Sequence, residues 1–384
     1  MNFHKPLPQD HVAYGWACWL DTEEITVQDQ HMTWLACFSI STQAAVYQGV
    51  LPPLSPFHQL KYVKNAIRQL GPILQPEHQA SLAIYECVCN YSIALEDTED
   101  LAAHLPLVQT FEAALDSIEQ IYSTHSMPEL NILLQYAKLN LYAMVVLEGS
   151  QAGSQVDEQS VLNKRALLLR GLESASRVIY QMKELSLLPV ENGVSNAGKL
   201  TFYPRQYITN MFFAAIYLFR MLVDCRPIGQ MHVTLALGSI AEARDIFRLM
   251  PHNRAALMGA DFLSRVVDKA HAIDASSSVL SLPQLLITNR LGASLLYDII
   301  FRMRFFARKE SNGHLAVQSQ ERVDNGLQSD VLAPEARPQP PDIQQEPLDT
   351  SLVQHSGENV WFSWDTFSGS VGIDFDLYSY NWTG

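Results

Sequence analysis

The stretch MFFAAIYLF, residues 211–219, is the most apolar run in the chain. Apolar residues continue on both sides of it at helical spacing and form one stripe: Ile208, Phe212, Ala215, Phe219 and Leu222. A helix that is apolar nearly all round normally lies at the centre of its domain. Arg220 and Asp224 follow the run at once, whereas a membrane span needs about 20 predominantly apolar residues. We therefore predict a buried core helix.

Two other segments carry apolar residues at spacings of three and four, which place them on one helical face. In residues 104–125 they are Leu107, Phe111, Leu115, Ile118 and Tyr122. In a helix that ends near Leu188 and Pro189 they are Leu168, Leu172, Ala175, Ile179 and Met182. Each stripe predicts an amphipathic helix that buries this face against the core.

Helices are predicted along most of the first 308 residues. Further helical segments span 231–249, 253–272 and 282–308. Helix breakers separate the segments, among them Pro52, Pro53, Gly71, Pro72, Pro128, Pro227 and Pro251. Alternating strand patterns are scarce. We therefore predict an all-α fold, with one domain of about ten or more helices over residues 1–308.

Sequence motifs of enzymes are absent: the chain has no GxxxxGK[ST], GxGxxG, GxSxG or HExxH pattern. The cysteines are odd in number and irregularly spaced, which indicates a reducing compartment: Cys18, Cys37, Cys87, Cys89 and Cys225. Cys87 and Cys89 lie on an apolar helical stretch and are expected to be buried thiols. We predict a protein that is not an enzyme, with no catalytic, cofactor-binding or metal-binding residue.

Two polar features leave two interpretations each. Thr209 and Asn210 fall inside the apolar helix, where they either hydrogen-bond to the backbone or a neighbouring helix, or line a small-molecule pocket. A basic patch ends the last predicted helix and consists of Arg302, Arg304, Arg308 and Lys309. Cations there suit the helix dipole; the alternative is a nuclear-import signal or a phosphate contact.

The acidic charge is concentrated at the end of the chain. The net charge is −14, and residues 311–384 hold eleven acids and two bases. No part has the basic excess of a nucleic-acid-binding surface, so we expect no direct nucleic-acid binding and no membrane partner. Residues 309–360 are rich in Gln, Ser, Glu and Pro and poor in large apolar residues. This composition predicts a disordered linker.

The last 24 residues, 361–384, mix aromatic and acidic side chains. They hold eight aromatic residues and three acids, with no Lys or Arg. This composition is typical of an activation domain, in which acids keep the segment soluble and aromatics anchor a partner. The alternative is a terminal strand or hairpin that docks on its own core. The predicted partner-binding residues are Trp361, Phe362, Trp364, Phe367, Phe375, Leu377 and Trp382.

Several segments together resemble one protein family. Residues 202–207, FYPRQY, resemble the aromatic-proline entry to a core helix in the regulatory domain of fungal zinc-cluster transcription factors. Residues 232–250, followed by PHNRAA, are similar to the helix pair that comes next there, and residues 288–298, TNRLGASLLYD, to its closing helix. Residues 34–54, which end YQGVLPPL, resemble an earlier helix and its glycine-proline exit. The resemblance covers roughly residues 15–308.

The resemblance implies an all-helical regulatory domain, a C-terminal activation segment, and a DNA-binding module of six cysteines around two zinc ions. The five dispersed cysteines include no CxxC pair and cannot form that module. We therefore expect a nuclear transcriptional regulator, also present in the cytoplasm, that acts through a DNA-binding partner and contacts coactivators or the transcription machinery. The resemblance permits a role at a metabolic gene cluster.

Two alternatives remain. The chain could be a truncated piece of a full-length DNA-binding factor whose zinc cluster is encoded upstream. It could also be a non-catalytic helical ligand-binding or scaffold protein, which an internal pocket with convergent polar groups would support.

Overall fold

The computed structural model describes residues 26–96, 98, 101–122, 127–148, 158–187, 200, 204–224, 229–250, 253–275 and 291–301. Within these residues the fold is all-α and contains no strand, as predicted. The predicted linker and the acidic-aromatic segment lie outside the described residues. The chain divides into two units, and every described residue up to Ile299 belongs to the first.

The helices follow one another with short connections where the chain between them is described. In order they are α1 (Val27–Gln48), α2 (Phe57–Leu70), α3 (Pro76–Glu96), α4 (Leu101–Tyr122), α5 (Pro128–Glu148), α6 (Glu158–Leu187), α8 (Arg205–Asp224), α9 (Gln230–Arg248), α10 (Arg254–Ala275) and the 3-10 turn η3 (Leu291–Ala293), after which the chain stays helical to Phe301.

Local sequence signals explain where α1 begins and ends. Thr26 and Asp29 form a capping box, in which each side chain accepts the other residue's backbone N–H. Gly49 closes the helix with φ 62° and ψ 42°, a left-handed conformation that glycine adopts without steric cost. This is the glycine exit expected from the sequence. α3 and α5 both begin with proline, which has no N–H to leave unpaired in a first turn.

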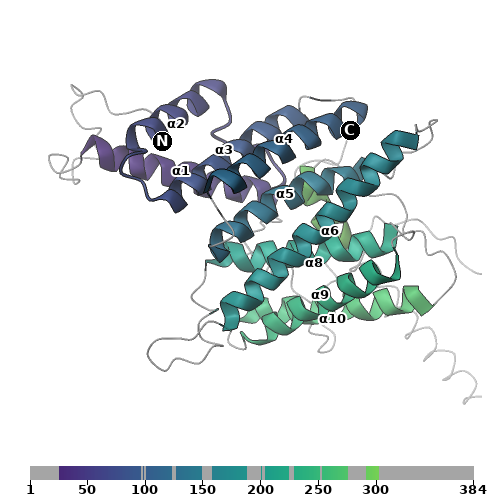
Figure 1. Ribbon diagram of the computed structural model, residues 1–384. Coiled ribbons are helices and arrows are strands. Elements are labelled where there is room, and N and C mark those ends of the chain that lie inside the picture. Colours follow the sequence, from purple (N-terminus) through teal and green to yellow (C-terminus); the bar gives the residue numbers. More distant parts are fainter. Residues whose placement is uncertain are drawn as a thin grey trace, which may run out of the picture. The chain divides into compact units, whose positions relative to one another are not determined.

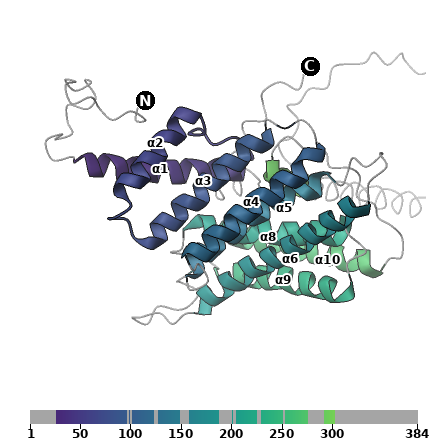
Figure 2. The same cartoon turned by 45° about the horizontal axis from the view of Figure 1, so that its top comes forward.

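The helices pack mainly against their neighbours in the chain. α5 contacts α3, α4, α6, α8 and η3, and α8 contacts α5, α6, α9 and α10. Figures 1 and 2 show α5 and α6 between the helices α1–α4 and the helices α8–α10. α5, α6 and α8 therefore form the centre of the core.

The central position of α8 confirms the prediction made from its apolar run. Every residue from 207 to 221 is buried. Within the described residues one helix, Arg205–Val223, is long and apolar enough to cross a membrane, but 89% of its most apolar window is buried inside the protein. It is the core helix of a helical domain.

The stripe predicted for α6 is also confirmed, because all five of its apolar residues are buried. The helices predicted at 231–249 and 253–272 correspond to α9 and α10 within three residues at each end. Of the helix predicted at 282–308, only residues 291–301 are described, and they are helical.

The stripe predicted for α4 is confirmed only in part. Of its five apolar members only Leu115 is fully buried, and the most buried line instead follows His104, Val108, Glu112 and Leu115. The physical reason is that α4 faces a polar stripe on α5 and turns acidic side chains towards it. α5 itself is buried throughout residues 130–146, although it contains a lysine and several amides.

Candidate functional site

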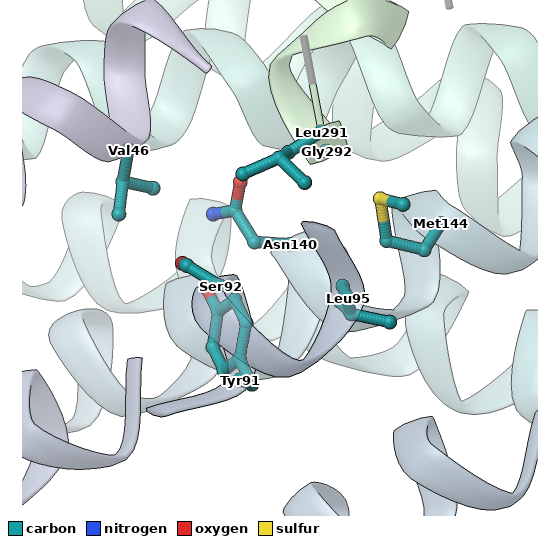
Figure 3. Close-up of a pocket in the computed structure, with 8 residues that line it drawn as sticks. All are labelled: Val46, Tyr91, Ser92, Leu95, Asn140, Met144, Leu291 and Gly292. Carbon is teal, nitrogen blue, oxygen red and sulfur yellow. The ribbon is translucent and has the colours of Figure 1, made fainter. Parts of the chain in front are cut away.

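A small cavity lies where α1, α3, α5 and η3 meet (Figure 3). Its lining consists of Val46, Tyr91, Ser92, Leu95, Asn140, Met144, Leu291 and Gly292. Figure 3 shows Asn140 reaching from α5 towards Leu291 and Gly292, with Tyr91 and Ser92 of α3 on its other side. The cavity marks the place where η3 joins helices from much earlier in the chain.

η3 approaches α5 closely at Gly292. A Cβ atom on this residue would lie 2.8 Å from the backbone oxygen of Asn140 and 2.9 Å from its Oδ1, so only glycine fits. The amide of Asn140 is held in place because its Nδ2 donates to the backbone oxygen of Tyr136 at 3.0 Å. Leu291 has a φ of 44°, which costs a non-glycine residue about 1 kcal/mol or more. Packing around η3 must offset this strain.

The cavity is too small for a substrate or effector. Its volume is about 10 Å³, which leaves room for about one water molecule. Sites for small-molecule ligands usually enclose about 300 Å³ or more. The buried hydroxyl of Tyr91 has no hydrogen-bond partner among the described residues, and a single water could provide one. The lining suits a structural water and offers no reacting group.

Glu112 on α4 joins three helices. Its Oε1 accepts from the Tyr142 hydroxyl of α5 at 2.5 Å, and its Oε2 accepts from Arg170 Nη1 of α6 at 2.6 Å. Burial, and next the Glu112 carboxylate, raises the pKa of Tyr142, and the hydrogen bond to Glu112 raises the pKa of the Arg170 guanidinium. Because both of its oxygens are engaged, this buried carboxylate holds helices together and is poorly placed to act as an acid or base.

Lys138 forms a second charged link between α4 and α5. Its side chain is 8% exposed, and its Nζ lies 2.6 Å from Asp116 Oδ1 and also pairs with Glu119. α4 contains no Lys or Arg, and Lys138 is the only one in α5. A buried cation between two carboxylates fixes how these helices align, because a shift would leave the charge without a counterion.

Tyr47 connects α1 to α8 through the polar residues inside the apolar helix. Its hydroxyl lies 2.5 Å from Asn210 Oδ1 and 3.1 Å from the Gln206 backbone oxygen, and it accepts from Gln43 Nε2 at 3.1 Å. Burial raises the pKa of Tyr47 well above its usual value. The Thr209 hydroxyl donates to its own helix, to the Arg205 backbone oxygen. Asn210 and Thr209 therefore make the local contacts of the first interpretation, and neither lines the cavity.

The helical segment after η3 is anchored to α8 by a buried charge pair. Arg220 Nη1 lies 3.3 Å from Asp298 Oδ2, and the two side chains are 1% and 0% exposed. A buried pair adds little net stability compared with apolar residues, but removal of one member is strongly destabilising. The pair therefore fixes the position of this segment.

The prediction for the two neighbouring cysteines is confirmed. Cys87 and Cys89 are buried on α3, and burial raises the pKa of both thiols to about 12. They are consequently inert at neutral pH. Among the residues that the structure describes, no group of three or more His, Cys, Asp or Glu side chains could hold a metal ion.

The predicted partner-binding residues lie outside the described residues, as do the basic patch of Arg302, Arg304, Arg308 and Lys309. Sequence reasoning missed the charged links, although a signal was available. Glu112, Asp116 and Glu119 recur at spacings of four and three on a helix without Lys or Arg, and Lys138 is the single Lys or Arg of the next helix. Opposite charges of this kind on neighbouring helices indicate pairing across their interface.

No family model, no curated protein and no solved structure matches the chain. The class of protein is therefore defined by its architecture, an all-α core whose helices are joined by buried polar contacts.

Proposed function

We propose that the protein is a transcriptional regulator that is directed to DNA by a DNA-binding partner. Residues 361–384 contact coactivators or the transcription machinery. The observation that carries this proposal is the composition of that segment, with eight aromatic residues, three aspartates and no base. The residues proposed to contact coactivators or the transcription machinery are Trp361, Phe362, Trp364, Phe367, Phe375, Leu377 and Trp382.

The core supports this proposal through the chemistry of its buried polar groups. Glu112 and Lys138 are buried and fully engaged in links between helices. The cavity beside Asn140 admits about one water molecule. These features suit a rigid scaffold and give no reason to assign catalysis or a small-molecule effector. The proposed role of the core is to present the acidic-aromatic segment on a 52-residue linker, residues 309–360.

The proposal places the protein in the nucleus, and also in the cytoplasm. Its five cysteines are too few for a six-cysteine zinc cluster, so a DNA-binding partner would supply sequence recognition. The resemblance to the regulatory domain of fungal zinc-cluster factors agrees with this role and with a partner from that family.

A fusion of residues 311–384 to a heterologous DNA-binding domain tests the proposal. We expect activation of a reporter that carries the matching DNA site. A fusion of residues 311–360 alone, which contain no aromatic residue, should be inactive. A silent 311–384 fusion that is expressed at the level of an active control would refute the proposed output role.

The aromatic side chains, and not the mere presence of the segment, should carry the signal. Replacement of Trp361, Trp364 and Phe367 with alanine should remove most of the activation, because aromatic anchors dominate interfaces of this kind. The matched control replaces Ser363, Thr366 and Ser368 with alanine in the same stretch and should stay active. Equal loss in both variants would argue against aromatic anchoring.

A further inference from the structure

The side of α1 that points away from the core is apolar and exposed. Between residues 32 and 44 this outer face consists of Met32, Thr33, Ala36, Cys37, Ile40 and Ala44. Met32 is 41% exposed and Ile40 is 67% exposed. No charged side chain stands among these residues of α1.

A surface helix normally places polar or charged residues opposite its buried face. α1 buries Trp34, Leu35 and Phe38 on its inner face. There Trp34 packs edge-to-face against Tyr62 of α2, with ring centroids 4.9 Å apart. Its outer face also carries mostly apolar residues, and the single acid of the helix, Asp29, is used in the N-terminal cap. A helix with apolar residues on both sides is expected to pack against another segment on each side.

We propose that residues 12–20 of the same chain, VAYGWACWL, cover the outer face of α1. These nine residues contain no charge, and eight of them are apolar or aromatic. Val12, Trp16 and Trp19 recur at spacings of four and three, which places them on one side of a helical turn. Residues 12–20 lie outside the described residues.

Size and charge both favour this occupant. The outer face has four small residues, Thr33, Ala36, Cys37 and Ala44, beside two larger side chains, Met32 and Ile40. Residues 12–20 bring the large rings that such a surface can accommodate, since well-packed interfaces set large residues against small ones. The acidic-aromatic segment fits less well, because it would place aspartates on a face that has no cation to pair with them.

The chain is short enough to fold back on α1. Five residues, 21–25, separate the segment from the helix cap at Thr26, within the two to eight residues that usually connect packed helices. The outer face extends over about 18 Å, and nine helical residues cover about 13 Å of it. A short tether also holds the segment at a local concentration of about a millimolar or more, which favours it over a separate molecule.

Cys18 of the segment and Cys37 of the outer face provide a direct test in the full chain. In a Cys225→Ser background, a short bismaleimide should join Cys18 to Cys37 within one molecule, since the buried Cys87 and Cys89 thiols do not compete. Peptide mapping of the monomer identifies the link. A Cys18–Cys37 link found only in covalent dimers would assign the face to a second copy. Single labelling of both thiols without a link would overturn the proposal.

A second variant identifies the occupant without cross-linking. Trp16→Asp with Trp19→Asp should release the segment and raise the rate of Cys37 alkylation about tenfold or more, because the thiol reacts only when uncovered. The matched control, Trp361→Asp with Trp364→Asp, places the same two changes in the acidic-aromatic segment and should leave the rate unchanged. An increase in the control alone would assign the face to that segment, and no increase in either would refute coverage by residues 12–20. Far-UV circular dichroism confirms that each variant folds.

Discussion

Gly171 allows α6 to pass close to both α5 and α8. A Cβ atom on this residue would lie 2.1 Å from Tyr217 Oη, 2.6 Å from Tyr217 Cζ and 3.0 Å from Tyr142 Cβ. Tyr217 lies on α8 and is fully buried, so its ring has no open space into which it can turn. We predict that Gly171→Ala destabilises the fold, although alanine is the better helix former.

The structure sets the size of this effect. The Tyr217 hydroxyl would have to retreat by about 1.3 Å to reach ordinary van der Waals contact at 3.4 Å. Overpacking of a dense core costs up to about 3 kcal/mol. Replacement of a glycine by alanine in a helix interior by itself stabilises the helix by up to about 1 kcal/mol. The net loss is therefore about 2 kcal/mol, or about 3 °C in Tm for a domain of this size.

Gly238 on α9 provides the matched control. It is also a glycine inside a long helix, but a Cβ atom there meets nothing within 4 Å. Gly238→Ala should therefore stabilise the protein by about 0.5–1 kcal/mol through helix propensity alone. Urea unfolding followed by far-UV circular dichroism measures both variants, which should shift the midpoint in opposite directions.

Equal stability of Gly171→Ala and Gly238→Ala would refute this prediction, because the ring of Tyr217 would then not occupy the space beside residue 171. A double-mutant cycle identifies the clash directly. In a Tyr217→Leu background both nearest atoms are gone, so Gly171→Ala should become neutral or stabilising. In a Tyr217→Phe background Cζ remains at 2.6 Å, and only part of the loss should be recovered.

Two further predictions concern buried ionisable groups. Lys138→Met should destabilise the fold by about 3 kcal/mol, the low end for breaking a buried pair, because Asp116 is half exposed. Lys64→Met should cost less than about 1 kcal/mol, because the pair of Lys64 with Glu86 lies at the surface. Equal urea midpoints for the two variants would contradict this prediction. Alkaline pH should also destabilise the fold, because burial raises the pKa of Cys87 and Cys89 from 9.0 to about 12. The native state keeps protons that the unfolded chain loses, so this stability is complete below about pH 9 and is lost towards about pH 12, with buried tyrosines such as Tyr47 acting in the same direction. Urea midpoints at about pH 8 and about pH 10.5 measure the effect, and a constant midpoint would refute it.

The sequence predicted those parts of the fold that depend on apolar periodicity. The stripes of α6 and α8 lie in the core as expected, because their neighbours are also apolar and packing follows the hydrophobic pattern. The end of α1 at Gly49 and the starts at Pro76 and Pro128 follow from backbone chemistry that acts within a few residues. Such signals are local and do not depend on which helix lies opposite.

The burial of α5 could not be predicted from its apolar periodicity. Asn131, Gln135 and Lys138 recur at spacings of four and three, the pattern of a solvent-facing stripe, yet all three are buried. The partners of Lys138 lie on another helix, since α4 turns Asp116 and Glu119 towards it. Periodicity within one helix cannot reveal this, since the polar stripe becomes part of the core only when a complementary stripe meets it.

The same limit explains why the cavity was not expected from the sequence. Val46, Tyr91, Asn140 and Gly292 come from four elements, and only the fold brings them together. The close approach of Gly292 to Asn140 requires both a glycine and a side chain held by its own helix, and neither residue is unusual by itself. The acidic-aromatic segment differs in kind. Its proposed role depends on its composition and on contacts with a partner, and not on the packing of the helical core.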